Sequence, residues 1–155
     1  MRYIFIHHAL PEEMVRALSV YGRCIPLPPF SRLPHPVSAH PDMLLINVDG
    51  TLMVHREYAE GQEILRENGI PYVLSHTAVE KEYPCDVRLN GFRLGSFFFA
   101  HKTGISEDLR CLAEKKSLCF VPVRQGYAKC ATAVAGGAIA TADVTIERAA
   151  KDVGI

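Results

Sequence analysis

The hydrophobic pattern of the chain alternates between short apolar runs and segments in which apolar residues recur at helical spacing. The run Tyr3 to Ile6 predicts a strand. A helix is predicted after it, because Pro11 and two acidic residues precede apolar positions at helical spacing, and Gly22 is a suitable residue to end it. Residues 24–27 predict a second strand. The first thirty residues therefore supply strand, helix and strand.

Three turn-forming dipeptides organise the rest of the chain. Asp49-Gly50, Asn90-Gly91 and Gly136-Gly137 each lie between apolar runs, and their first residues are separated by 41 and 46 residues. Each predicted hairpin is followed by a helical pattern. A recurring strand–turn–strand–helix–strand unit of about 40 residues is typical of repeat architectures. An ordinary α/β domain whose hairpins recur by chance is the alternative.

The flanking segments complete these units. They are the predicted strands 43–48, 51–55, 71–74, 87–89, 92–100 and 118–123, and the predicted helices 57–68, 106–116 and 144–153. We expect one domain over residues 1–155, with a partial unit at 1–30, a proline-rich connector at 31–39 and units at 40–75, 83–123 and 127–155.

Composition excludes several classes of protein. Seventeen basic and seventeen acidic residues cancel without a basic cluster, so we expect no nucleic-acid partner. Five cysteines without CxxC spacing argue against a disulfide framework and fit a reducing cytoplasm. The seven histidines lack metal-ligand spacing, so neither a metal site nor a cofactor is expected. No apolar run reaches the roughly 20 residues of a membrane span.

Several short strings carry a resemblance to a known family. They are His40-Pro-Asp42, Tyr83-Pro-Cys-Asp86 with Asn90, His101-Lys-Thr103, Gln125-Gly-Tyr-Ala-Lys-Cys130 and Ile139-Ala-Thr-Ala-Asp143. With the repeating ββαβ unit, they resemble an uncharacterised bacterial branch of the pentein fold, the five-bladed α/β propeller of amidinotransferases and arginine-deiminase-like enzymes. The resemblance covers about residues 40 to 155.

The resemblance implies a fold of repeated ββαβ blades and an activity on guanidino groups. Enzymes of this kind use a late cysteine nucleophile, a histidine and carboxylates that hold the guanidinium. The blade with that cysteine would lie beyond Ile155. We therefore expect an incomplete ring in a C-terminally incomplete chain, or a ring that closes by pairing with another copy. Open sheet edges favour a homo-oligomer.

Cys130 and Lys129 are the adjacent pair that points most directly to chemistry, since a nearby cation can lower the pKa of a thiol and make it reactive. If residues 125–130 form a strand, however, the two side chains point to opposite faces, and a buried core cysteine is the interpretation we favour over a reactive thiolate. On that strand Gln125, Tyr127 and Lys129 share one face, which either lines a cavity or is solvated.

Asp86 is the natural carboxylate for a guanidinium, and it is a weak catalytic candidate together with Cys130. Asn90 lies near it, although simple turn chemistry also explains both residues. Lys102 either reaches an anionic group of a substrate or is a solvent-exposed residue at the end of its strand. Asp42 either enters the same cavity or caps a turn.

Residues 43–52 also resemble the first motif of haloacid-dehalogenase-like phosphatases. The position of the nucleophilic aspartate holds Asn47, whose amide cannot form a phospho-enzyme, and no acidic pair for Mg²⁺ follows. Three hypotheses remain. The first is an enzyme on amidino or guanidino groups, a hydrolase or transferase. The second is a non-catalytic binder of a small charged metabolite, and the third and weakest is a phosphatase relic.

Overall fold

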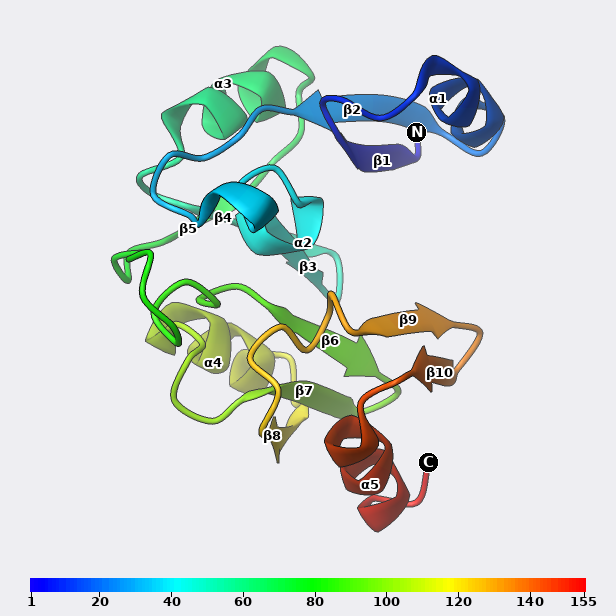
Figure 1. Cartoon of the computed structure of the whole chain (residues 1–155), viewed down its shortest axis with the longest axis vertical. Coiled ribbons are helices and arrows are strands. Elements are labelled where there is room, and N and C mark those ends of the chain that lie inside the picture. The colour runs from blue at the N-terminus through cyan, green and yellow to red at the C-terminus, as the bar shows by residue number, and fades with distance from the viewer.

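The computed structural model describes all 155 residues as a mixed α/β protein with five α-helices (Figure 1). The units follow one another along its long axis, from β1, α1 and β2 at one end to α5 at the other. The elements in chain order are β1 (Tyr3–His7), α1 (Glu12–Ser19), β2 (Arg23–Leu27), a 3₁₀ turn (His35–Val37), α2 (Pro41–Leu44), β3 (Leu45–Val48), β4 (Thr51–His55), α3 (Ala59–Glu67), β5 (Val73–Ser75), β6 (Gly91–Leu94), β7 (Phe97–His101), α4 (Glu107–Lys115), β8 (Cys119–Val123), β9 (Thr132–Ala135), β10 (Ala138–Thr141) and α5 (Val144–Asp152).

The strands form four small sheets that do not close into a barrel. β1 and β2 pair in parallel. In the two three-stranded sheets an antiparallel hairpin, β3–β4 or β6–β7, is followed by a helix and by a parallel third strand, β5 or β8. β9 and β10 form a hairpin that leads into α5. The ββαβ order expected from the sequence is therefore present twice in full.

Two of the three predicted hairpin turns are confirmed. Asp49 and Gly50 have φ angles of 49° and 82°, and Gly136 and Gly137 have φ angles of 57° and 84°. Positive φ at both central positions matches the twist of the flanking strands and favours Asp-Gly and Gly-Gly. The Asn47 carboxamide accepts a hydrogen bond from Gly50 N at 2.9 Å, so Asn47 stabilises the first turn.

The prediction of a turn at Asn90-Gly91 is wrong, as is the strand predicted at 87–89, and the single strand predicted at 92–100 is divided by a turn into β6 and β7. Residues 87–90 are turn and loop, β6 begins at Gly91, and the hairpin turns at Gly95-Ser96, where Gly95 has a φ of 58°. Asn90 is fully buried, and its side chain bonds to distant segments instead of supporting a local turn. The three hairpin turns start at Asp49, Gly95 and Gly136, which are 46 and 41 residues apart. The spacing of the hairpins therefore remains close to regular.

Three other segments differ from the expectation. The apolar run at 43–48 begins as helix, because Pro41 and Asp42 favour the first turn of α2, and only Leu45–Val48 is strand. Residues 125–130 form turns and no strand: Ala131 N donates to Tyr127 O at 2.9 Å, and Thr132 N donates to Lys129 O at 3.1 Å. α1 ends at Ser19, before Gly22.

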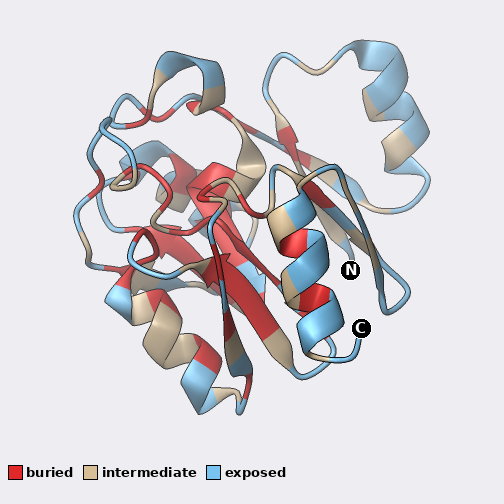
Figure 2. Cartoon of the chain, turned by 60° about the horizontal axis from the view of Figure 1, so that its bottom comes forward, coloured by how far each residue is buried: buried red, intermediate tan, exposed pale blue.

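Buried side chains link each unit to the next. One hydrophobic cluster combines Ile46, Val48 and Met53 of the β3–β4 hairpin with residues of β7 and α4, including Phe98 and Leu109. A further cluster joins the β6–β8 sheet to α5. Figure 2 shows the central strands largely buried and α1 largely exposed. None of the helices has the length and apolar character needed to cross a membrane.

Candidate functional site

Three turns that precede the hairpins meet at Asn90. They are α2 with His40 before it, the turn at 83–90 and the turn at 126–131. The Asn90 amide donates to Asp42 O at 3.1 Å, and its carbonyl accepts from Lys129 N at 2.7 Å. The same amide nitrogen lies 3.2 Å from Cys130 Sγ. Asn90 thus fixes the other two turns relative to its own, and we call this arrangement the three-turn site.

The half-buried Tyr127 and the buried Asp86 form a hydrogen-bonded pair beside Asn90. The Tyr127 hydroxyl donates to Asp86 Oδ2, whereas Asp86 Oδ1 has no partner although the residue is only 1% exposed. Burial and the adjacent carboxylate raise the pKa of Tyr127 to about 12, so the phenol stays protonated and remains a donor. The Tyr83 ring stacks on Tyr127 with centroids 6.2 Å apart. Asp86 is therefore held by a tyrosine rather than presented to a ligand.

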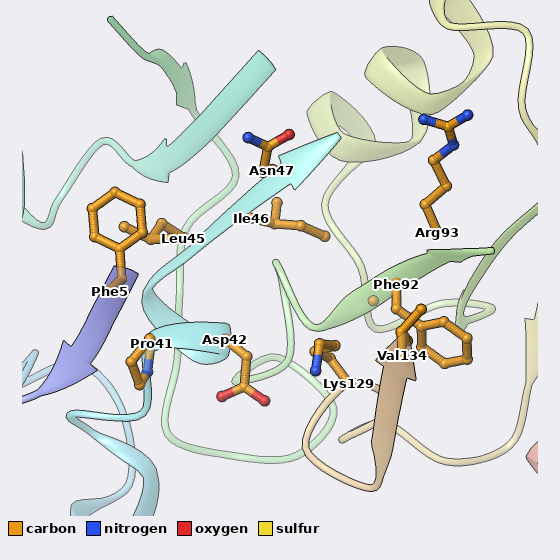
Figure 3. Close-up of a pocket in the computed structure, with 11 residues that line it drawn as sticks. Phe5, Pro41, Asp42, Leu45, Ile46, Asn47, Phe92, Arg93, Lys129 and Val134 are labelled. Carbon is orange, nitrogen blue, oxygen red and sulfur yellow. The ribbon is translucent and has the colours of Figure 1, made fainter. Parts of the chain in front are cut away.

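A cavity of about 360 Å³ opens beside the three-turn site (Figure 3). Asp42 and Lys129 lie near each other at one end of it, and Asn47 and Arg93 lie at the other. Most of the remaining wall is apolar. The residues that line it are Phe5, Pro41, Asp42, Leu45, Ile46, Asn47, Gly91, Phe92, Arg93, Lys129 and Val134.

The charged side chains at the two ends of the cavity differ in whether they already form ion pairs. Arg93 pairs with Asp49 outside the cavity. Asp42 and Lys129 are half-buried and form no ion pair with each other or with other residues. The Lys129 ammonium donates one hydrogen bond, to Thr132 O at 3.1 Å. The end of the cavity near Asp42 therefore holds a carboxylate and an ammonium that both retain binding capacity.

Cys130 lies at the rim of the three-turn site together with His40 and Asp42. One ligand atom from each of the three residues lies within 4.8 Å of the others. Desolvation of the sulfur and the neighbouring Asp42 carboxylate raise the pKa of Cys130 to about 12, although part of the residue is exposed. The free thiol is therefore protonated at neutral pH, and Lys129 does not make it a thiolate. The prediction that Cys130 is a buried core residue is wrong.

The other predicted site residues lie outside the cavity. The Gln125 amide donates to Asp143 Oδ2 at 3.1 Å and its carbonyl accepts from Tyr127 N at 3.1 Å, so Gln125 ties the turn at 126–131 to the start of α5. Lys102 is exposed in the turn after β7. Of the six predicted ligand-binding residues, Lys129 alone lines the cavity, and Asn90, Tyr127 and Asp86 build the turns around it.

The sequence matches the family of unknown function DUF6873 over residues 5–155. The chain belongs to this family. No curated protein and no solved structure matches it.

Sequence reasoning missed part of the site. It named Asp42 only as an alternative, and it gave His40, Phe5 and Phe92 no role. The available signal was His40-Pro-Asp42. Proline and an acidic residue are typical of the first turn of a helix, and this places His40 and Asp42 together at the N-terminus of α2. Phe5 lies on the first strand, far from the other lining residues in sequence, and no local pattern connects them.

Proposed function

We propose that the cavity at the three-turn site binds a small metabolite that carries both a positive and a negative group, of the guanidino or amino-acid type. The observation that carries this proposal is the placement of Asp42 and Lys129 at one end of a largely apolar cavity. Its volume of about 360 Å³ falls within the range of small-molecule sites, roughly 300–1,000 Å³.

Each chemical group of such a ligand has a matching side chain in the cavity. A guanidinium forms two parallel charge-assisted hydrogen bonds with a carboxylate, and Asp42 offers one that no cation occupies. The Lys129 ammonium has donors to spare for a ligand carboxylate. Phe5 and Phe92 supply apolar surface for the methylene groups between the two charges.

The resemblance to penteins supports the same class of ligand. In this interpretation the two complete ββαβ units are blades of a propeller-like fold, with the β9–β10 hairpin and α5 as a further partial blade. In penteins, carboxylates hold the guanidinium group. The carboxylate expected to do so, Asp86, is engaged by Tyr127, and Asp42 takes that role here.

Thiol chemistry at Cys130 is a second candidate function, because His40 and Asp42 lie beside the sulfur. In such an enzyme His40 would accept the thiol proton as Cys130 attacks the guanidinium carbon and return it to the nitrogen group that leaves, and water would then hydrolyse the carbon–sulfur bond to restore the thiol. The raised pKa of Cys130 opposes this in the free protein, so we rank binding without turnover first. Release of ammonia or urea from L-arginine, abolished by Cys130→Ser, would reverse the ranking.

Calorimetric titration with L-arginine tests the binding proposal. Lys129→Met and Asp42→Asn should each weaken binding by about 10- to 100-fold, the equivalent of one charge-assisted hydrogen bond of roughly 1.5–3 kcal/mol. Lys102→Met is the matched control, because this lysine is exposed outside the cavity, and it should bind like the wild type. Thermal unfolding confirms that each variant is folded.

Two outcomes would overturn the proposal. The first is no heat of binding for L-arginine or for its decarboxylated analogue, which keeps the guanidinium. The second is an equal loss of affinity in Lys129→Met and Lys102→Met, since the effect would then come from net charge rather than from the cavity.

A further inference from the structure

We propose that His40, Asp42 and Cys130 bind a divalent transition metal of the zinc type, leaving one coordination position open toward solvent or a ligand. These three residues come from two of the turns at the three-turn site, and no sequence motif connects them. The proposal rests on their placement, on the absence of competing partners and on the chemistry of the donor set.

The three donor atoms are close to the spacing that a metal requires. They lie within 4.8 Å of one another. Bond lengths of about 2.0–2.3 Å in a tetrahedral site place the ligand atoms about 3.3–3.8 Å apart. A closure of about 1 Å is therefore sufficient, and side-chain rotation of the half-buried His40 and Asp42 and of the exposed Cys130 can supply it.

Asn90 holds the two ligand-bearing turns at this separation. Its amide donates to the backbone of Asp42 at 3.1 Å, and its carbonyl accepts from Lys129 N, the residue before Cys130, at 2.7 Å. Because Asn90 is fully buried, the distance between the turns is fixed by the interior rather than by mobile surface groups. Such support is what a preformed metal site needs.

The donor groups are free to turn toward a metal. No hydrogen bond engages the His40 ring, whose nearest aromatic neighbour is His7, with centroids 6.4 Å apart. Asp42 has no cationic partner. The Asn90 amide nitrogen lies 3.2 Å from Cys130 Sγ, where its N–H stabilises negative charge on sulfur as outer partners of metal thiolates do.

The donor set selects the metal. One imidazole nitrogen, one carboxylate oxygen and one thiolate suit Zn²⁺, whereas Mg²⁺ and Ca²⁺ prefer oxygen ligands alone. Binding forms one metal–sulfur bond and breaks one S–H bond, and the released proton passes to the buffer. No electron is transferred, so no oxidant or reductant is needed.

The metal and a cationic metabolite group would compete for Asp42, but the two proposals can be tested apart. His40 does not line the cavity and Lys129 is not among the three metal donors. His40→Gln should therefore weaken metal binding and keep L-arginine affinity, whereas Lys129→Met should weaken L-arginine binding and keep metal affinity.

The experiment is a titration of the reduced, metal-free full chain with Co²⁺, followed by displacement with Zn²⁺. We expect one Co²⁺ per chain, with a near-ultraviolet thiolate-to-cobalt charge-transfer band that Zn²⁺ removes. Loss of an outer partner alone weakens metal binding by about 10- to 100-fold, so Cys130→Ser and His40→Gln should each weaken it by at least about tenfold. Cys119→Ser and His76→Gln are matched controls, because both residues are exposed and lie outside the cluster.

Three results would overturn the proposal. They are the absence of the charge-transfer band in the folded wild type, its persistence in Cys130→Ser, and an equal loss in Cys119→Ser, which would show adventitious binding to surface thiols. Circular dichroism of each variant separates loss of metal binding from loss of fold.

Discussion

Tyr127 and Asp86 form a part-buried hydrogen bond that should stabilise the turn at 126–131. The Tyr127 hydroxyl is the one hydrogen-bond partner of the Asp86 side chain. Tyr127→Phe leaves this carboxylate buried without a donor, which costs about 1–3 kcal/mol for a neutral group and more for a charged one. We expect the free energy of unfolding in urea to fall by at least that amount.

Tyr83→Phe is the control for this change. Tyr83 stacks on Tyr127, is 54% exposed and donates no hydrogen bond through its hydroxyl. Removal of this hydroxyl should therefore change the free energy of unfolding by less than about 0.5 kcal/mol. Equal effects of the two substitutions would show that the hydrogen bond from Tyr127 to Asp86 adds no measurable stability.

His55 should make the stability of the protein depend on pH. Burial lowers its pKa from 6.5 to about 4, and its ring donates from Nε2 to Met43 O at 3.0 Å while Nδ1 lacks a partner. Between pH 6.5 and 4 the unfolded chain binds the proton that the folded chain rejects, so the unfolding free energy falls as pH decreases. The slope rises toward about 1.4 kcal/mol per pH unit as the unfolded imidazole becomes fully protonated, so we expect a loss of roughly 1.5 kcal/mol from pH 6.5 to pH 5.

Urea unfolding at several pH values measures this loss. His55→Gln retains a donor for Met43 O but does not titrate, so this part of the pH dependence should disappear. His76→Gln, at an exposed histidine, should leave it unchanged. An unaltered pH dependence in His55→Gln would assign the effect to another group.

At the scale of elements, the N-terminus of α5 depends on Asp143. Its Oδ1 accepts from the Thr145 hydroxyl at 2.6 Å, from Thr145 N at 2.8 Å and from Ile146 N at 3.1 Å, and these bonds lower its pKa. Asp143→Ala should lower the unfolding free energy by about 1–2 kcal/mol, as loss of a helix cap does, whereas Asp143→Ser should restore most of it.

Asp152 at the other end of α5 provides the control. It is exposed, and its negative charge lies near the negative end of the helix dipole, so Asp152→Ala should be neutral or slightly stabilising. A loss in Asp152→Ala as large as that in Asp143→Ala would mean that helix content, rather than capping, sets the result. Thermal unfolding compares the two variants.

Helices and two hairpins were predictable because their signals are local. Ser106 caps α4 by accepting from Leu109 N at 3.1 Å, and Asp143 caps α5, as their sequences indicate. The hairpin after Asn90 was misplaced because Asn-Gly is a strong turn signal, whereas tertiary contacts recruit the Asn90 side chain instead. Those contacts span 48 residues to Asp42 and 40 residues to Cys130, beyond the reach of any local pattern.

At the scale of the whole molecule, the order of the units was predictable and their convergence was not. Repeated hairpins and helices indicate units that bury their apolar faces against neighbours, and the shared hydrophobic clusters follow this arrangement. The site forms where three turns, each preceding a hairpin, meet. The sequence identified residues in all three, but only the packing of the units separates Lys129 and Asp42 in the cavity from Asp86 and Asn90 in its support.

The most direct test of the central claim is to follow the backbone amide NMR signals of the labelled protein during addition of L-arginine. The three-turn site predicts shifts concentrated in residues 40–47, 90–93 and 126–134, which line the cavity or hold it, with the Lys129 amide among the largest because it bonds to Asn90. Signals of α1, at the far end of the molecule from α5, should stay in place (Figure 1). Shifts centred on α1 or α3, or none at saturating ligand, would contradict binding at this cavity.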